Sequence, residues 1–223
     1  GSGWFIGSPT SVIYDYEKIG IWQTNEATEA AKYGQEPGDI KVRDLDKNGT
    51  IDSNNDRKVL GQLTPKWTAG LNNRFEYKGW ELSFFLYARV GHMIASQAAG
   101  NFNPSGWTNS IACDYWTPEN PTSDIPAATN SSSNRVISSR IIEDGSYLRL
   151  KNVTVGYTFP AKLVKKWKID KARVYVAAQN LWTCTGYSGY DPEVSVRNSA
   201  LTPGLDYSSY PRAYSISFGV SLG

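Results

Sequence analysis

The chain has 223 residues, 13% of them aromatic, and a formal net charge of +2 from 23 basic and 21 acidic side chains. This length suits one large β domain or part of a larger one. The basic residues form no block, which argues against a nucleic-acid partner, and no run of about twenty apolar residues occurs, which excludes a transmembrane helix.

The first residues lack the basic n-region and the apolar h-region of a signal peptide. If the protein is exported, we therefore expect that Gly1 is not its original N-terminus. Residues 4–16 have the pattern of the end of an earlier strand and the loop after it, which favours a preceding polypeptide.

The segment 17–66 is expected to be a loop, and it contains a candidate calcium site. Oxygen-bearing residues recur around Gly49 in the pattern of an EF-hand loop. The candidate ligands are Asp44, Asp46, Asn48, Thr50, Asp52 and Asp56. Position twelve of the loop, where a bidentate carboxylate belongs, is Asn55, and Asp56 lies one residue late. The alternatives are a structural Ca²⁺ that stiffens the loop and an acidic turn held by hydrogen bonds of its own side chains.

Residues 67–91 predict a long β-hairpin. Apolar and polar residues alternate over 67–77 and again over 80–90, so each arm has one apolar face. Lys78-Gly79 between the arms has the length of a two-residue hairpin turn. The charged residues of the opposite face are Arg74, Glu76, Glu81 and Arg89.

Residues 92–146 predict a long loop that is rich in aromatic, Asn and Ser residues. Such rings can stack on sugars or hold peptide side chains, and they can equally form the small core that a long ordered loop needs. The candidate substrate contacts are Trp107, Tyr115, Trp116 and, at the end of the preceding strand, Arg89. His92 has no nucleophile-elbow sequence to accompany it, so we expect it to be a loop or lumen residue without a catalytic role.

Two further strands are predicted at 147–159 and 171–182. Leu148 and Leu150 alternate in one phase whereas Val153 and Val155 alternate in the other, and a bulge near 151–152 would reconcile the two. The final strand, 213–223, alternates without a break. Its apolar residues are Tyr214, Ile216, Phe218, Val220 and Leu222.

The connections alternate between short (78–79 and 159–170) and long (92–146 and 183–212). Outer-membrane barrels have this rhythm, with short periplasmic turns and long extracellular loops. Five strands cannot close such a barrel, so we expect an all-β fold in which these antiparallel strands are part of a larger transmembrane barrel. A secreted carbohydrate-binding β-sandwich with a structural calcium site is the alternative, since it would share the aromatic composition.

Several short sequences occur in the order typical of SusC/RagA-type TonB-dependent outer-membrane transporters and span almost the whole chain. They are Gly20-Ile-Trp-Gln23, Tyr33-Gly-Gln-Glu-Pro-Gly-Asp39, Asp44-Leu-Asp-Lys-Asn-Gly-Thr-Ile-Asp52, Gly145-Ser-Tyr-Leu-Arg-Leu-Lys-Asn-Val-Thr-Val-Gly-Tyr157, Gln179-Asn-Leu181, Tyr187-Ser-Gly-Tyr-Asp-Pro-Glu193, Tyr210-Pro211 and Ser217-Phe-Gly-Val220. The chain therefore resembles the C-terminal portion of such a transporter.

The resemblance implies a barrel of about 22 strands with an N-terminal plug, a SusD-like surface lipoprotein over it, and energy supplied through TonB. The implied function is active import of oligosaccharides or peptides across the outer membrane of a Gram-negative bacterium. No bond is broken, so we expect no enzymatic activity and no catalytic cofactor. A surface adhesin or a passive porin would work without TonB.

The two cysteines, Cys113 and Cys184, lie far apart in the sequence. They could pair in an oxidising compartment, but the sequence does not decide whether they do.

Overall fold

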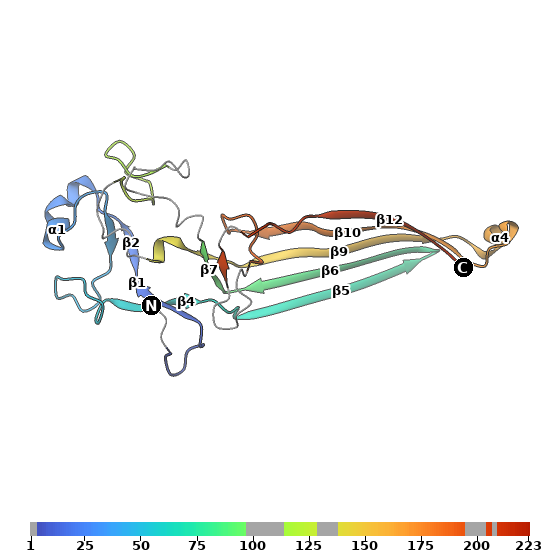
Figure 1. Ribbon diagram of the computed structural model, residues 1–223, viewed down its shortest axis with the longest axis horizontal. Helices are drawn as coiled ribbons and strands as arrows, with labels where there is room; N and C mark the ends of the chain where they lie inside the picture. Colours follow the sequence, from blue (N-terminus) through green and yellow to red (C-terminus); the bar gives the residue numbers. More distant parts are fainter. Residues whose placement is uncertain (1–3, 97–113, 129–137, 195–203, 207–208) are drawn as a thin grey trace. The chain divides into compact units, whose positions relative to one another are not determined.

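The computed structural model describes residues 4–96, 114–128, 138–194, 204–206 and 209–223. It divides into two compact units (Figure 1). The first, here called the sheet unit, comprises residues 65–92, 144–193 and 210–223. The second, here called the loop unit, comprises residues 1–64, 93–143 and 194–209.

The sheet unit contains long strands and one short helical connection. Its elements are β5 (Trp67–Tyr77), β6 (Trp80–Val90), β9 (Tyr147–Thr158), α4 (Ala161–Val164), the 3-10 turn η3 (Lys165–Trp167), β10 (Ala172–Thr185) and β12 (Ser215–Leu222). The strands form one five-stranded sheet in the order β12-β10-β9-β6-β5, with every neighbouring pair antiparallel. β10 extends beyond the predicted end at 182 because its last residues continue to pair with the start of β9.

One face of this sheet is apolar and exposed. Strand alternation directs every second side chain to it, and the register aligns these side chains in rows. One row crosses all five strands and consists of Phe218, Val176, Val155, Leu82 and Phe75. These five side chains are all exposed, with between 38% and 80% of their surface accessible. A continuous apolar face of this kind requires a cover of lipid or protein.

The bulge expected near 151–152 is present. β9 pairs with both neighbouring strands through Asn152 and Leu150, and Lys151 between them has no partner in either ladder. β10 leaves Asn180 and Leu181 unpaired at the same level. The extra residue in β9 brings the two apolar phases of this strand onto one face, as the sequence requires.

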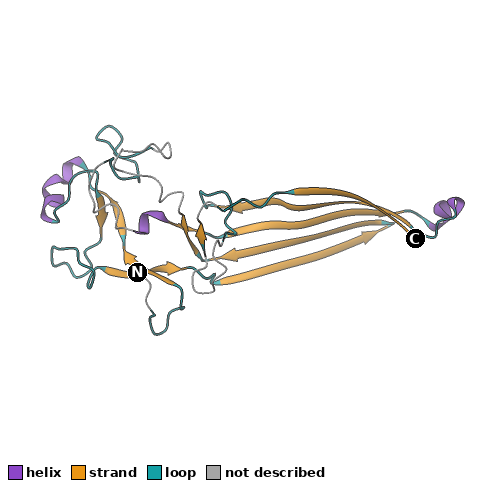
Figure 2. Cartoon of the chain, viewed as in Figure 1, coloured by secondary structure: helices purple, strands orange, loops and turns teal. Residues whose placement is uncertain are grey.

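The turn between β5 and β6 is a tight hairpin. Lys78 and Gly79 have φ angles of 49° and 88°, and positive values at both positions are what a type I′ turn needs. A Cβ on Gly79 would lie 2.7 Å from the carbonyl oxygen of Thr158. Only glycine therefore fits this position without displacing the neighbouring strand. Figure 2 shows the second short connection, with α4, beyond the same ends of the strands.

The loop unit consists of short elements where the sequence predicted loops. They are β1 (Val12–Tyr16), β2 (Lys18–Ile21), the 3-10 turn η1 (Thr24–Glu26), α1 (Ala27–Lys32), β3 (Ile40–Val42), β4 (Arg57–Gln62), β7 (Met93–Ser96), the 3-10 turn η2 (Ser138–Ile141), β8 (Ile142–Asp144) and β11 (Leu205–Asp206). β1 pairs with β4 and β2 with β3, while β7 lies between β11 and β8. Strands this short do not produce enough alternation to be recognised in the sequence.

The core of the loop unit consists of Ile21, Ile40, Val42 and Trp116. Trp116 comes from the segment 114–128, which is far from the other three in sequence. An ion pair of 2.8 Å between Lys18 and Asp124 also joins this segment to β2. No helix among the described residues is long and apolar enough to cross a membrane.

Candidate functional site

The polar face of the sheet carries two clusters of charge, one near each end of the strands. In the cluster near the short turns, Glu81 of β6 lies between two arginines. Its carboxylate is 3.6 Å from Nε of Arg74 and 3.2 Å from Nη2 of Arg173. Arg74 also pairs with Glu76 on its own strand. These side chains line a polar hollow of about 600 Å³, and their charges are largely balanced within the cluster.

The second cluster joins β9 to the segment after β10, and it centres on Arg149. The Arg149 side chain is only 3% exposed. Its Nη2 donates to Oδ1 of Asp191 at 2.6 Å, and its Nη1 donates to Oε2 of Glu193 at 2.9 Å. Its Nε donates to the hydroxyl of Thr183 on β10 at 2.9 Å. The guanidinium is therefore satisfied on three sides, as a buried charge must be.

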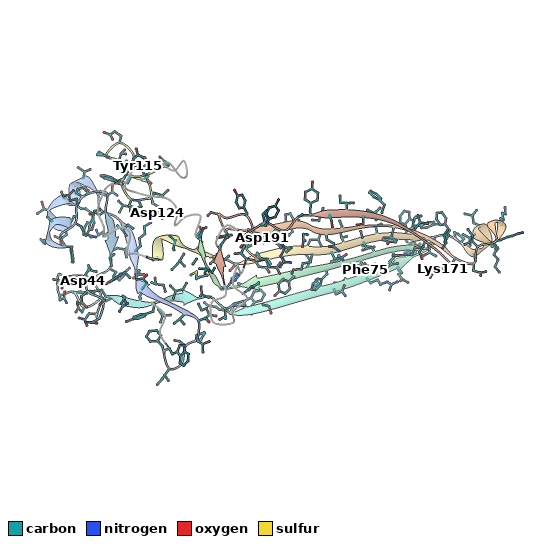
Figure 3. The ribbon with its side chains drawn as sticks, in the orientation of Figure 1. Asp44, Phe75, Tyr115, Asp124, Lys171 and Asp191 are labelled. Carbon is teal, nitrogen blue, oxygen red and sulfur yellow. The ribbon has the colours of Figure 1, made fainter. Side chains whose placement is uncertain are left out.

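Two further basic residues complete this cluster. Lys151 donates to Oε1 of Glu193 at 2.7 Å, and Arg212 lies 3.5 Å from the same carboxylate. The backbone N–H of Arg212 donates to Oδ2 of Asp191 at 3.1 Å. We call Arg149, Lys151, Asp191, Glu193 and Arg212 the loop clamp, because they hold the segments on either side of the β10–β12 connection against β9. Figure 3 shows Asp191 at the end of the sheet opposite Lys171.

The loop clamp changes the acidity of Asp191. Burial by itself raises the pKa of this carboxyl, but hydrogen bonds from Arg149 and from the backbone amides of Glu193 and Arg212 outweigh burial and hold the pKa below its usual range. Asp191 is therefore ionised in the folded protein at neutral pH. The segment that contains Asp191 and Glu193 is recognisable in the sequence by its resemblance to the family alone, and the sequence predicts no role for either residue.

Arg89, a predicted substrate contact, lies beside a buried histidine and a buried tyrosine. His92 and Tyr147 are 1% and 3% exposed, with ring centroids 6.3 Å apart. Within the described residues, Nε of Arg89, the Tyr147 hydroxyl and both His92 nitrogens have no hydrogen bond of ordinary geometry. Burial lowers the pKa of His92 to about 4, assisted by the charge of Arg89 and opposed by Asp144. His92 is therefore neutral at pH 7.

The predicted aromatic contacts have different positions. Tyr115 is 42% exposed and is free to meet a ligand. Trp116 is 4% exposed, and its Nε1 donates to Gln23 at 3.1 Å, which favours the packing role that the sequence left open. Trp107 and Cys113 lie outside the described residues. Cys184 is exposed and has a free thiol.

The acidic loop brings three of the predicted calcium ligands together. Asp44, Asp46 and Asp56 each place one carboxylate oxygen within 4.8 Å of the other two. Asp56 is fully buried and accepts hydrogen bonds from the amides of Leu45 at 2.7 Å and Asp52 at 2.8 Å. Asp56, which follows position twelve of the EF-hand pattern, is thus the residue whose carboxylate points into the loop.

The same loop is also shaped by hydrogen bonds of its own side chains. Asp44 accepts from the amides of Lys47 and Gly49 at 2.6 and 2.9 Å. Burial opposes the effect of these bonds, yet together with other bonds in the loop they hold the pKa of Asp44 below its usual range. Asn48 accepts from the amide of Thr50 at 2.8 Å. Asp52 is not one of the three converging carboxylates, and it accepts from the amides of Asn54 and Asn55 at 2.7 and 3.0 Å. The loop therefore has the internal hydrogen bonds of the acidic-turn alternative, and its three converging carboxylates keep the calcium alternative open.

Comparison with known proteins relates the chain to TonB-dependent receptors. It is 37% identical over 226 residues to TonB-dependent receptor P3 of Formosa agariphila and 31% identical over 227 residues to receptor P26 of the same organism. These matches cover 97% of this chain but only 22% and 23% of those receptors. TonB-dependent receptor SusC of Bacteroides thetaiotaomicron is 29% identical over 80% of this chain and 17% of its own length. No family model matches.

Solved structures agree with these relatives. The RagAB peptide importer in its open-open state superposes with a TM-score of 0.73 and 26% identity, over 98% of this chain and 23% of that one. The same importer in its closed-closed state superposes with a TM-score of 0.71, again with 26% identity.

The fold and these matches define a class: the chain is part of a transmembrane β-barrel of the kind found in TonB-dependent transporters. More narrowly, it is a fragment of SusC/RagA type. Such receptors are outer-membrane proteins of Gram-negative bacteria. The chain spans less than a quarter of the relatives that it matches.

Proposed function

We propose that this chain forms part of the barrel wall and outer loops of a TonB-dependent importer that carries oligosaccharides or peptides across the outer membrane. The observation that carries this proposal is the single sheet with one exposed apolar face and one charged face. In a barrel the first face meets lipid and the second lines a wet interior. The related receptors support the energy source and the location.

The contribution of this chain is to build and shape the wall. The charged face provides hydrogen-bonding side chains to a hydrated substrate, and the loop clamp keeps the segment around Asp191 folded against that face. A SusD-like lipoprotein would capture the substrate at the surface, and TonB would displace the plug. Both of these steps depend on parts outside this chain. The role proposed for this chain includes no bond-breaking step.

Arg89, Tyr115 and Trp107 remain the candidate substrate contacts, whereas the burial of Trp116 favours a packing role for that residue. Tyr115 has the exposed ring that stacking on a sugar or an apolar peptide side chain needs. Nε of Arg89 is buried and no described residue engages it, so this atom is less accessible to a substrate than the ring of Tyr115.

Uptake by cells that express the whole transporter tests this function. Labelled oligosaccharide and peptide mixtures would be supplied to wild-type cells and to cells without TonB. We expect uptake of one class, lost when TonB is absent. Equal uptake without TonB would favour a passive porin, and binding of either class without any uptake would favour an adhesin.

The β-sandwich alternative is not favoured, because the apolar face of the sheet unit is exposed and the relatives of the chain are TonB-dependent receptors. Fractionation provides a direct test. The whole protein should leave the membrane only with detergent, whereas a sandwich would be soluble without it.

We also propose that Asp44, Asp46 and Asp56 hold a structural Ca²⁺. Three converging carboxylates are a donor set that this hard cation prefers, and the ion would relieve the repulsion between them. Calorimetry on the whole protein should show calcium uptake by the wild type and none by Asp44→Asn/Asp56→Asn. A Glu119→Gln variant is the control, since Glu119 is an exposed carboxylate outside the acidic loop. Wild-type protein that takes up no calcium at millimolar concentration would contradict the proposal.

A further inference from the structure

The connection between β9 and β10 is strongly basic, and its lysine side chains are exposed. It carries the exposed lysines Lys162, Lys165, Lys166, Lys168 and Lys171. Asp170 is the single acidic residue of the connection. None of these lysines forms an ion pair or a side-chain hydrogen bond within the described residues. Five uncompensated charges on one short connection are costly unless an anion or bulk water balances them.

The place of this basic connection along the sheet is specific. The apolar rows of the outer face end at an aromatic group in which Trp80 lies 4.9 Å from Tyr157, and Tyr157 lies 5.2 Å from Phe159. Phe159 is two residues before the helical turn that carries the first of the lysines. Moving along β9, the side chains therefore change from apolar to aromatic to cationic. A bilayer changes in the same order, from hydrocarbon to interface to phosphate.

The helical turn at the start of the connection is itself amphipathic. Leu163 is 41% exposed and is surrounded in sequence by lysines, whereas Val164 is fully buried. An exposed leucine beside cations is typical of segments that lie in a membrane interface, where the apolar side chain enters the lipid and the lysines remain at the headgroups. Lys78 in the neighbouring hairpin turn adds a cation at the same end of the sheet.

We propose that the basic connection 161–171 binds the phosphate groups of anionic phospholipids in the leaflet at the short-turn end of the barrel. The inference rests on the proposed barrel and adds a specific lipid contact to it. Lysines are suited to this task, because each is a compact charge on a flexible stem that reaches a phosphate without fixed geometry. Lys171 also lines the polar hollow beside Arg74 and Arg173, while the exposed side chains of the other four lysines favour a lipid surface over a folded anionic partner.

The test measures lipid bound to the whole transporter. Wild-type protein and Lys162→Gln/Lys165→Gln/Lys166→Gln/Lys168→Gln would be purified in mild detergent and titrated with phosphatidylglycerol, with bound lipids counted by native mass spectrometry. We expect the glutamine variant to need at least about tenfold more lipid for the same occupancy, since each of the four lysines near an anionic surface contributes severalfold. Binding by the wild type should weaken as salt rises.

Matched controls separate this effect from misfolding. The four lysines replaced by arginine keep the charge, so that variant should bind like the wild type. Phosphatidylcholine should bind weakly to all variants, and inorganic phosphate at the lipid concentration should not compete. Equal phosphatidylglycerol occupancy in the glutamine variant and the wild type would overturn the proposal, as would wild-type binding that does not prefer the anionic lipid. A barrel that never enters membranes would instead refute the proposed function, and fractionation of all variants reports this separately.

Discussion

At the residue scale, the side chain of Arg149 is held in one position. Its guanidinium is almost completely buried, and two carboxylates with a hydroxyl satisfy it. A buried ion pair adds little net stability relative to apolar residues, but removing one partner leaves the other charge unpaired. The main role of the loop clamp is therefore to fix a position and not to add stability. It holds the two ends of the β10–β12 connection in place.

Replacing one partner of the clamp should be costly. In Asp191→Asn the shape is kept, but Arg149 loses its closest counter-charge, so we expect the whole protein to lose about 3 kcal/mol of stability. Denaturant unfolding in detergent measures this change. Glu119→Gln is the matched control, because Glu119 is an exposed carboxylate outside the clamp, and it should stay within about 0.5 kcal/mol of the wild type. A change no larger in Asp191→Asn than in this control would contradict the assigned role.

Asp191 should also make stability depend on pH. Its pKa is lowered in the folded state, so its contribution is fully present above the unfolded value of about 3.9. The contribution is lost as the pH falls through the folded value. We expect the difference in stability between wild type and Asp191→Asn to be constant from pH 7 to about pH 5 and to shrink below about pH 4. A difference that shrinks already near pH 6 would point to another group.

At the scale of elements, glycines on the polar face make room for side chains of the next strand. Gly219 of β12 lies directly under the ring of Tyr175 on β10, and a Cβ there would collide with the ring. A Cβ on Gly156 of β9 would lie 3.0 Å from the guanidinium of Arg173, which in turn stacks on Tyr175 at 4.8 Å. The ring and the guanidinium can lie flat across the sheet because these two positions carry no side chain.

Gly219→Val should therefore destabilise the β10–β12 pair. The added side chain forces the Tyr175 ring off the strand, and overpacking of this kind typically costs about 1–3 kcal/mol. Thermal unfolding of the whole protein measures the loss. In a Tyr175→Ala background the same substitution should cost much less, because the obstacle is gone. Additive losses in the double variant would show that the ring and the glycine act independently.

The strands and the bulge at Lys151 could be predicted from the sequence, because long alternation and one change of phase are local signals. The loop clamp could not. Its partners are 42 and 44 residues apart, and their pairing depends on how the chain folds back after β10. The burial of Trp116 could not be predicted either, since the sequence around an aromatic residue in a polar loop is the same whether the ring binds a ligand or packs in a core. Asp56, one residue late for an ideal calcium loop, converges with Asp44 and Asp46 because the backbone turn adapts.

At the scale of the whole molecule, the sheet unit has two open edges, at β5 and β12. Strands with unpaired edges associate with further strands, so this wall is complete only when neighbouring strands cover both. The relatives, which are more than four times as long as the matched region, have the additional chain to do so. The stability of the wall is therefore a property of the whole barrel, and each measurement above belongs on the complete protein.

The unpaired residues of β9 and β10 have a consequence for the solvent. Lys151, Asn180 and Leu181 lie level with one another and outside the register of the ladder, so together they form a local break in β9 and β10 where we expect amide protons to be less protected. Hydrogen–deuterium exchange on the complete transporter should show a band of faster exchange at these residues, between slower stretches of the same strands. Uniform protection along β9 and β10 would contradict this. If the band is present, β9 and β10 each have a compliant point between two stiffer stretches, and bending of these two strands during transport would concentrate there.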